Sequence, residues 1–442
     1  MITARCYARL RFAPAVQTLR HLRATQFWPR EKVRQYQWEK LQKLLRHAYA
    51  NVPYWRRVLD ACGATPADLR TPDDFRRLPV LTKPLIRANI VDMIARPLPP
   101  EDLLPNATGG STGEPLQLYQ DRQYLRWAHA ARMRGWYEIA GCRQGDRCAV
   151  LWGDVREVHS DFSLKERLKE IFQYGTVTLN SFNLSQQRMR KFLRWCRWFR
   201  PKLLLGYVTA IDEFAAFLDE NHLSFPALRG IVLCAETVYP DVQANIERVF
   251  RAPSYNTYGG REVSMIAMEC AAKNGLHEVS ENNYVEFEPI DLPGYPGAGN
   301  LLVTNLNNYA MPLLRYRIGD IGVPSTRESC DCGRGLPLIA QVIGRTTEVF
   351  EFYDGTKIAG EMFIHLMKEF PLKEYQFIQV SARKVILRMT VADARVPGLQ
   401  SRIRAAYRPY LPAEVVIEFE EVNCIERTAT GKFRFVFRQL RD

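Results

Sequence analysis

The sequence of 442 residues has no apolar run close to the roughly 18–20 residues that a membrane-spanning helix needs. The longest candidates, Leu203–Leu205 and Gly230–Ala235, have the length of buried strands. Ten cysteines are too few for a disulfide-stapled chain, and Arg5, Arg9 and Arg11 interrupt any apolar core of a secretory signal. There is no internal repeat or low-complexity segment. These absences predict a globular, cytoplasmic protein with no transmembrane segment.

The composition is that of a folded protein. Hydrophobic residues make up 47% and charged residues 25% of the chain, which excludes a disordered or collagen-like protein. The formal net charge of +13 comes from 61 Lys and Arg against 48 Asp and Glu, with both signs interspersed. An anionic small molecule is compatible with this charge. Nucleic acid is not a predicted partner, because no basic patch is interleaved with aromatic residues.

The N-terminal residues 1–36 carry eight Arg and Lys but only one acidic residue, Glu31. Their periodicity predicts a basic amphipathic helix, which is typical of a transit peptide or a membrane-surface contact. The alternative is an ordinary helix that packs on the domain through Leu10, Phe12, Val16 and Leu19.

From about residue 100 to 320, short apolar runs alternate with amphipathic stretches of helical length, which predicts an α/β fold with largely parallel sheet. The predicted strands are Cys148–Trp152, Leu203–Tyr207, Ile231–Ala235 and Leu301–Asn305. The predicted helices are Gln186–Phe199, Ala210–Asn221 and Asp241–Arg251. Because the composition changes after Gly344, we expect a large N-terminal α/β domain over 1–344 and a small, mobile α+β domain over 345–442.

The strongest local motif is Thr108-Gly109-Gly110-Ser111-Thr112-Gly113. Its glycines can adopt positive φ, and its hydroxyls and successive N–H groups suit a polyphosphate. It is not a Walker A loop, because no Gly-Lys-Ser/Thr ends it. The motif predicts a phosphate-binding loop, with a plain Gly/Ser linker as the alternative.

A second motif, Asn256-Thr257-Tyr258-Gly259-Gly260-Arg261-Glu262, follows an apolar segment. The ring of Tyr258 can stack on a purine, and the carboxylate of Glu262 can hold Mg²⁺. The alternative is a strand-to-loop turn with a surface carboxylate.

Three further motifs lie in the C-terminal third of the chain. Asp320 ends Leu314-Arg315-Tyr316-Arg317-Ile318-Gly319-Asp320, where a carboxylate at a glycine turn suits the two hydroxyls of a ribose. The pair Gly344-Arg345 follows. Lys432, within residues 427–434, is a mobile point charge suited to an anionic transition state, or else part of an exposed basic tail.

In this order and spacing, the five motifs resemble the adenylate-forming superfamily, which includes acyl-CoA synthetases, peptide-synthetase adenylation domains and luciferases, over nearly the whole chain. The branch it resembles most is the phenylacetate–CoA ligase-like family with its capsule-biosynthesis-associated members. That branch shares Ala267-Met268-Glu269-Cys270 and Met311-Pro312-Leu313-Leu314-Arg315-Tyr316-Arg317. The resemblance implies ATP-dependent, AMP-forming activation of a carboxylic acid, possibly aromatic, and then transfer to the thiol of coenzyme A.

The resemblance also implies a nucleotide site. The loop Thr108–Gly113 would cradle the β- and γ-phosphates of ATP, and Tyr258 would lie against the adenine. Ala235 and Glu236 would line the other side of the base. The remaining residues of the implied nucleotide site are Asn256, Thr257 and Gly259.

The catalytic groups follow in the same way. Glu262 would bind Mg²⁺, Asp320 and Arg345 would hold the ribose hydroxyls, and Lys432 would bridge the substrate carboxylate and the α-phosphate. Together Mg²⁺ and this lysine would offset the repulsion between two anions. The acid pocket would be lined by Trp152, Tyr207 and Gly260. In this superfamily the small C-terminal domain rotates between the two half-reactions.

A set of metal-ligand type is formed by Cys270, His277, Cys330 and Cys332. Three thiolates and one imidazole make a closed tetrahedral Zn²⁺ site, which predicts a structural metal. The resemblance to this branch also implies a structural zinc here, because some of its members carry one at the corresponding positions. The alternative is four unrelated residues, with the thiols buried as small hydrophobes.

Two positions depart from the superfamily pattern, Glu114 in place of a lysine and Thr347 in place of an aspartate, with Glu348 next. They favour a catalytically silent scaffold as one rival function. The other rival passes the adenylate to an amine or to the thiol of an acyl-carrier protein. The predicted oligomeric state is a monomer or a homodimer.

Overall fold

The computed structural model describes residues 13–440 except 109–115, 154–163, 182–183, 368, 371, 373, 391–396 and 427–432. Lys432 and the residues 109–113 of the predicted phosphate loop therefore lie outside the described residues. The chain divides into two compact units. Unit 1 comprises Met1–Glu286, Leu301–Ile318 and Pro324–Gln341, and unit 2 comprises Phe287–Asn300, Gly319–Val323 and Val342–Asp442. The proposed boundary between residues 344 and 345 stays a prediction.

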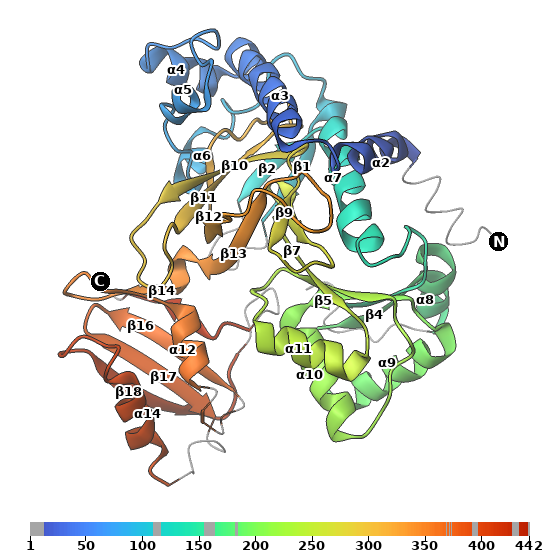
Figure 1. The fold of residues 1–442 in the computed structure, drawn as a ribbon, viewed down its shortest axis with the longest axis vertical. Helices are drawn as coiled ribbons and strands as arrows, with labels where there is room; N and C mark the ends of the chain where they lie inside the picture. The colour runs from blue at the N-terminus through green and yellow to red at the C-terminus, as the bar shows by residue number, and fades with distance from the viewer. Residues whose placement is uncertain are drawn as a thin grey trace. The chain divides into compact units, whose positions relative to one another are not determined.

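Five adjacent parallel strands form the core of unit 1 (Figure 1). In spatial order they are β4 (Thr176–Asn180), β3 (Cys148–Trp152), β5 (Leu203–Tyr207), β6 (Gly230–Cys234) and β7 (Ser254–Gly260). β3 and β5 have the predicted bounds. Strands β5 and β6 are buried along their whole length, because the sheet is covered on both faces.

Side chains along each strand point alternately to the two faces of the sheet, so the core has two layers. Ala149, Leu204 and Ile231 lie on the face that packs against three helices. These helices are α9 (Gln186–Phe199), α10 (Val208–Glu220) and α11 (Pro240–Phe250), as Figure 1 shows. Leu203 and Val232 lie on the opposite face, against the segment after helix α7 (Arg122–Arg132), which includes the π-helical turn η2 (Met133–Glu138). The period of two in the side chains therefore positions both layers.

Beyond β7 the sheet continues with antiparallel strands. The next strands in spatial order are β8 (Ser264–Glu269), β9 (Leu276–Glu278), β13 (Leu338–Arg345), β12 (Tyr316–Pro324), β11 (Gly299–Asn305) and β10 (Asn283–Pro289). A separate hairpin pairs β1 (Leu104–Ala107) with β2 (Gln117–Gln120). Smaller helical elements are α8 (Leu164–Lys169) and η4 (Glu170–Tyr174).

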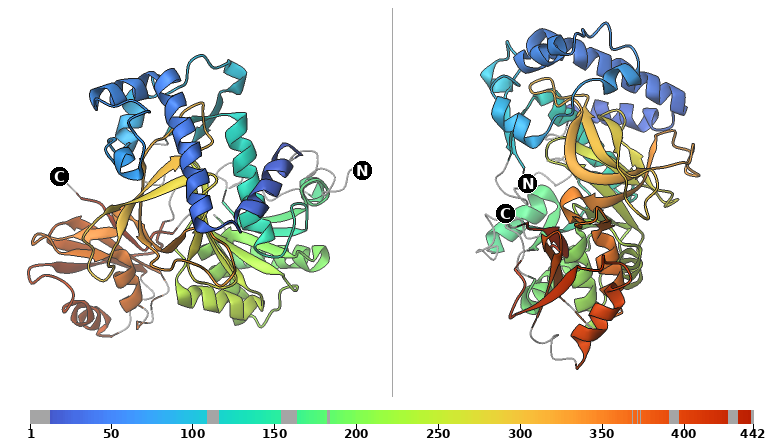
Figure 2. Two further views of the ribbon diagram at one scale, coloured as in Figure 1. Left: turned by 45° about the horizontal axis from the view of Figure 1, so that its top comes forward. Right: turned by 90° about the vertical axis from the view of Figure 1, so that its left-hand side faces the viewer.

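The N-terminal helices pack on unit 1 (Figure 2). They are α2 (Ala13–Thr25), α3 (Arg30–Asn51), α4 (Pro53–Ala61), α5 (Pro72–Arg76) and α6 (Lys83–Asn89). Leu19 is buried, as expected for a packed helix, whereas Val16 is exposed because it lies on the outward side of α2. Leu10 and Phe12 lie outside the described residues. The buried side of α2 agrees with a helix that packs on the domain.

A buried ion pair ties these helices to the sheet. Arg134 donates two hydrogen bonds to Glu281, at 2.8 and 3.0 Å, and both side chains are at most 2% exposed. Thr25 of α2 donates to the same carboxylate at 2.5 Å, and Lys40 of α3 donates to the Glu281 carbonyl at 2.6 Å. The charges are therefore paired and hydrogen-bonded, as buried charges must be.

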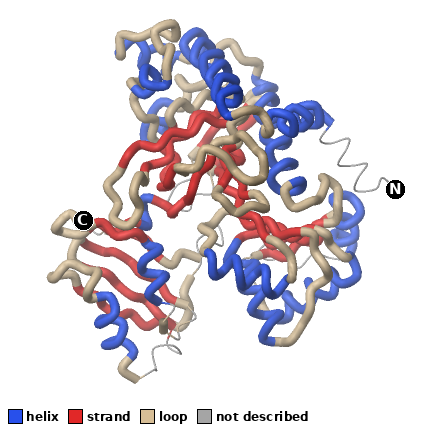
Figure 3. Tube along the Cα trace, viewed as in Figure 1, coloured by secondary structure: helices blue, strands red, loops and turns tan. Residues whose placement is uncertain are grey.

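Unit 2 has its own core, made by a four-stranded sheet and two helices (Figure 3). The strands in spatial order are β18 (Val416–Val422), β17 (Lys384–Thr390), β16 (Tyr375–Ser381) and β19 (Val436–Arg438). Helices α12 (Gly360–Met367) and α14 (Leu399–Tyr407) pack on one face, with Phe363, Phe377 and Tyr407 at the centre. A short hairpin joins β14 (Val349–Glu351) to β15 (Lys357–Ala359). The predicted fold class, a large α/β domain and a small α+β domain, is confirmed. Among the described residues, no helix has the length and apolar character needed to cross a bilayer.

Candidate functional site

The predicted pocket and nucleotide residues of unit 1 gather at the carboxyl edge of its parallel strands. Tyr207 ends β5 and is paired in register with Cys234 of β6, which is paired in turn with Thr257 of β7. Ala235 follows the last residue of β6 and Tyr258 is the next residue of β7, so both lie just beyond this row. The carboxyl edge of an open α/β sheet is where such folds bind ligands.

Two aromatic rings meet at this edge. Trp152 ends β3, and its ring centroid is 4.5 Å from that of Tyr207, with an angle of 41° between the planes. Trp136 lies 6.4 Å from Trp152 on the other side. The structure thus brings together two of the three residues predicted for the acid pocket and adds Trp136, which no motif indicated.

The turn after β6 has an unusual backbone. Ala235 adopts a left-handed conformation with φ of 67°, although it is not a glycine, and it is exposed. Glu236 accepts hydrogen bonds from the backbone N–H of Thr209 at 2.8 Å and from its hydroxyl. Because Thr209 lies in the first turn of α10, the carboxylate occupies a favourable helix N-terminus. This bond fixes the turn beside Tyr207.

The β7–β8 hairpin carries the second motif. Tyr258 is half-buried on β7, and the register shifts after it. A Cβ on Gly259 would lie 2.4 Å from the carbonyl oxygen of Ser264, so only glycine fits there. Asn256 donates its backbone N–H to Glu269 at 3.0 Å, and buried Thr257 donates to the Leu233 carbonyl at 3.0 Å. These bonds help to hold β7 in place, and the contacts predicted between these two residues and a nucleotide stay predictions.

Glu262 lies in the turn between β7 and β8 and is only 8% exposed. The hydroxyl of Tyr316, which is fully buried, donates to its Oε1 at 3.2 Å. A Cβ on Gly260 would lie 2.9 Å from Oε2. The carboxylate is thus held in one orientation between Tyr316 and the backbone of Gly260. Tyr316 was part of a recognised motif, but nothing in the sequence linked it to Glu262.

The stem of the predicted phosphate loop touches the same turn. Thr108 closes the β1–β2 hairpin, since its N–H donates to the Leu116 carbonyl at 3.0 Å and its hydroxyl accepts from the Leu116 N–H at 2.9 Å. Arg261 donates to the Ala107 carbonyl at 3.3 Å, and its own carbonyl accepts from Asn106 at 3.1 Å. The turn that carries Glu262 is therefore anchored to the strand that leads into the loop.

Asp320 and Arg345 lie together in unit 2, with Arg345 Nε 3.9 Å from Asp320 Oδ1. Glu348 accepts the backbone N–H of Arg345 at 3.0 Å. Burial raises the pKa of the Glu348 carboxyl, while Arg345 and Arg434 oppose this rise. Arg434 lies two residues after Lys432 in the chain. Glu348 and Arg434 are members of this charged group that were not predicted as site residues.

The predicted metal ligands come together in unit 1. The donor atoms of Cys270, His277, Cys330 and Cys332 all lie within 4.8 Å of one another. The Cys270 and Cys330 sulfurs are 3.6 Å apart, and Cys332 Sγ is 3.3 Å from His277 Nε2. A tetrahedral zinc site with bonds of about 2.3 Å places its sulfurs about 3.8 Å apart, so the arrangement fits this ion. We call these four residues the Cys/His cluster.

The neutral ring of His277 suits a metal, whereas the Cys270 thiol would have to lose its proton on binding one. Burial lowers the pKa of His277 to about 4, so its ring is neutral at pH 7, as a ligand must be. Burial raises the pKa of the Cys270 thiol to about 12. For Cys332, burial acts against ionisation, but hydrogen bonds from Arg334 outweigh it and lower the pKa.

The fold, with a mostly parallel sheet in the large unit and a separate small α+β unit, matches that of the adenylate-forming enzymes. In line with this class, residues 351–439 match the family model described as the CapK C-terminal domain. Protein CapK of Staphylococcus aureus is 24% identical over 385 residues, which cover 83% of this chain and 81% of that protein. Phenylacetate-coenzyme A ligase of Pseudomonas putida is 28% identical over 335 residues, 72% of each chain.

Among solved structures, that of 2-hydroxyisobutyryl-CoA ligase in the postadenylation state has a TM-score of 0.71 at 20% identity, and covers 94% of this chain and 91% of that one. This likeness shows the fold. The predicted resemblance to the phenylacetate–CoA ligase-like and capsule-associated branch is confirmed, and the chain is a relative of these proteins.

Proposed function

We propose that this protein uses ATP to activate a carboxylic acid as an acyl-adenylate and then transfers the acyl group to coenzyme A. In the first step a carboxylate oxygen attacks the α-phosphorus and pyrophosphate leaves. In the second step the thiol attacks the acyl carbon and AMP leaves. The phenylacetate–CoA ligases among its relatives, and the CoA ligase whose fold it shares, support this general reaction.

The observation that carries the proposal is the anchoring of Glu262. The turn that holds it is tied by Arg261 to the stem of the glycine loop, and its carboxylate is oriented by Tyr316. The strand that leads into the proposed phosphate-binding loop is thereby connected to the turn that carries the candidate Mg²⁺ ligand. When bound, Mg²⁺ would neutralise phosphate charge as the transition state forms.

The remaining nucleotide contacts follow from the strand ends. Tyr258 offers a ring to the adenine, beside the exposed turn of Ala235 and Glu236. We assign the ribose hydroxyls to Asp320, with Arg345 in support. Lys432 would stabilise the charge that develops between the carboxylate and the α-phosphate, and rotation of the C-terminal domain would bring it into and out of place.

The residues of the proposed acid pocket favour a carboxylic acid with a planar side chain. Trp152 is half-buried beside Tyr207 at the carboxyl edge, and the face of its ring can stack on a flat apolar group. An aromatic acid is therefore the first class to test. The rival acceptors remain an amine and the thiol of an acyl-carrier protein.

We further propose that the Cys/His cluster holds a structural Zn²⁺. All four donors point at one another, and three of the four residues are buried. With four protein ligands no coordination position stays open for a substrate. The ion would join the β8–β9 connection to the loop before β13, so its contribution would be to stability.

The test is pyrophosphate release from ATP with a panel of aromatic, aliphatic and amino-bearing acids, followed by AMP release with coenzyme A, a carrier protein or an amine. We expect acid-dependent pyrophosphate release with at least one aromatic acid and fastest AMP release with coenzyme A. No acid-dependent release across the panel, together with tight ATP binding, would support the catalytically silent scaffold instead. The cytoplasmic location and the monomer or homodimer stay predictions.

A further inference from the structure

Basic residues gather at the amino edge of the parallel strands, opposite the candidate site. Each of the segments that lead into β3, β5, β6 and β7 supplies one or two of them. We call these residues the basic rim: Arg147, Arg200, Lys202, Arg229 and Arg251. All but Lys202 are exposed.

Backbone contacts show that the rim is continuous. The N–H of Lys202 donates to the Arg147 carbonyl at 2.8 Å, and the N–H of Arg229 donates to the Lys202 carbonyl at 2.7 Å. The N–H of Ile231 donates to the carbonyl of Pro253 at 2.9 Å, and Pro253 lies two residues after Arg251 in the chain. The arginines therefore stand side by side along the edge of one rigid sheet.

Helix α9 extends the rim. Its apolar side is buried in the core, while Arg194 and Arg197 are exposed on its outer side. Trp198 is 59% exposed and meets Trp195 edge to face, at 6.0 Å between ring centroids. An exposed tryptophan beside arginines is typical of surfaces that meet the interface of a bilayer.

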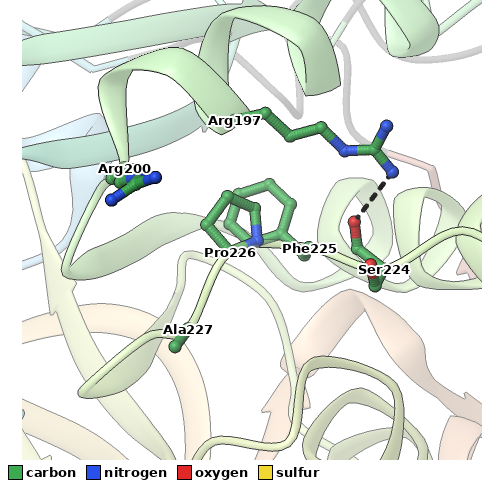
Figure 4. Close-up of a pocket in the computed structure, with 6 residues that line it drawn as sticks. All are labelled: Arg197, Arg200, Ser224, Phe225, Pro226 and Ala227. Carbon is green, nitrogen blue, oxygen red and sulfur yellow. Dashed lines mark hydrogen bonds between the residues drawn. The ribbon is translucent and has the colours of Figure 1, made fainter.

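A hollow of about 420 Å³ opens at the end of this helix (Figure 4). Arg197 and Arg200 lie on either side of the rings of Phe225 and Pro226, and Arg197 donates to the Ser224 carbonyl at 3.3 Å. Two guanidinium groups beside an apolar floor match the chemistry of a phosphate that carries a hydrocarbon group.

Few acidic side chains offset this charge. Lys202 is 3.6 Å from the buried carboxylate of Asp146, and Arg248 pairs with Asp219 at 2.8 Å. Among the described residues, no acidic partner is found for the side chains of Arg147, Arg200 or Arg251. The rim therefore keeps a net positive charge.

We propose that the basic rim docks the protein on an anionic phospholipid surface, as a peripheral contact independent of the proposed reaction. The candidate site would then face away from the bilayer, because a five-residue strand of about 16 Å separates the two edges. An acyl-carrier protein on the rim would sit at the edge opposite the carboxyl edge, so it is not the expected partner. Nucleic acid is disfavoured, because single-stranded sites need a row of aromatic platforms, and in the described segments that lead into β3, β5, β6 and β7 only Trp198 is an exposed aromatic residue.

The experiment is co-sedimentation of the full chain with vesicles of phosphatidylcholine alone or mixed with phosphatidylglycerol. We expect binding only to the anionic vesicles, and loss of binding as salt rises. The variant Arg147→Glu/Arg200→Glu/Arg251→Glu should lower the affinity at least about hundred-fold. Residues 200 and 251 have positive φ. Glutamate is unbranched at Cβ like arginine, so these substitutions should add no backbone strain.

A matched control reverses three exposed arginines of the N-terminal helical region, Arg20→Glu/Arg46→Glu/Arg77→Glu. It should keep the wild-type affinity, and both variants should keep the wild-type unfolding temperature. Equal loss in the control, binding to phosphatidylcholine alone, or rim-dependent binding to an oligonucleotide or an acidic protein without vesicle binding would each overturn the proposal. This test measures vesicle binding and not acid-dependent pyrophosphate release. Its result therefore does not depend on whether the proposed reaction is correct.

Discussion

The carboxyl edge and the Cys/His cluster belong to the same unit but are built differently. At the carboxyl edge, Trp152 and Tyr258 are half-buried and Ala235 is exposed, and their side chains come from separate strand ends. In the cluster, Cys270 and His277 are fully buried and the four donors face one another. The first region is open to a ligand, whereas the second is closed around a space the size of an ion. We expect the first to serve chemistry and the second to serve stability.

The largest effect is expected from Lys432→Ala, which removes the charge assigned to the adenylation transition state. Acid-dependent ATP–pyrophosphate exchange should fall about 10²–10³-fold, with the unfolding temperature unchanged. Glu262→Gln should act in the same direction, because it removes the candidate Mg²⁺ ligand.

Lys357→Ala, in the same unit as Lys432, is the matched control and should exchange at the wild-type rate. If ATP–pyrophosphate exchange stays at the wild-type rate in Lys432→Ala, the role assigned to this lysine is wrong. The proposed adenylation at the carboxyl edge would then lack its transition-state charge.

The opposite behaviour is expected in the Cys/His cluster. Cys332→Ser should lower zinc affinity at least about hundred-fold and lower the unfolding temperature, while exchange per folded molecule is kept. Elemental analysis and thermal unfolding measure both. Cys424→Ser changes an exposed thiol and should alter neither. One zinc per wild-type chain is expected, and none in protein purified without chelator would refute the metal.

The buried pair of Arg134 and Glu281 sharpens the comparison, because it too should affect stability alone. Glu281→Gln leaves the guanidinium uncompensated and should cost about 3 kcal/mol of unfolding free energy. Burial alone would raise the pKa of Glu281, but Arg134 and hydrogen bonds outweigh it and lower the pKa below 4.5.

The sign of the pH effect follows from this pKa. The carboxylate stabilises the fold above pH 4.5, and its contribution is lost as the pH falls through the lower, folded-state pKa. Urea titrations of the wild type should therefore show falling stability below about pH 4.5, with a weaker fall in Glu281→Gln. A control, Glu39→Gln on the exposed side of α3, should follow the wild type.

The smallest effect is expected from Tyr258→Ala. Loss of stacking on a base should raise the KM for ATP about tenfold with little change in kcat. Tyr258→Phe keeps the ring and should behave as the wild type. A tenfold change in kcat at constant KM would show that Tyr258 does not contact the base in the ground state.

The parallel half of the fold was predictable because buried parallel strands are continuous apolar runs. Cys148–Trp152, Leu203–Tyr207 and the helix Gln186–Phe199 have the predicted bounds. The antiparallel strands β8 and β9 were not predicted, since β9 is only three residues long and β8 contains a register shift between Met265 and Ala267. Local periodicity carries little signal for such strands.

The candidate site was predictable as a set of motifs but not as a set of contacts. Cys330 and Cys332 are close in sequence, so they could be recognised as candidate ligands from their spacing. The bond between Glu262 and Tyr316 joins residues 54 positions apart, and the contact between Arg261 and Ala107 spans 154. Which distant segments meet is decided by the sheet order, which no single motif contains.

The most direct test of the central claim is a crystal structure of the full chain with a non-hydrolysable ATP analogue and Mg²⁺. The account predicts the adenine against Tyr258, the metal at Glu262 and the phosphates in the loop that begins at Thr108. A nucleotide bound away from the carboxyl edge of the parallel strands would contradict it.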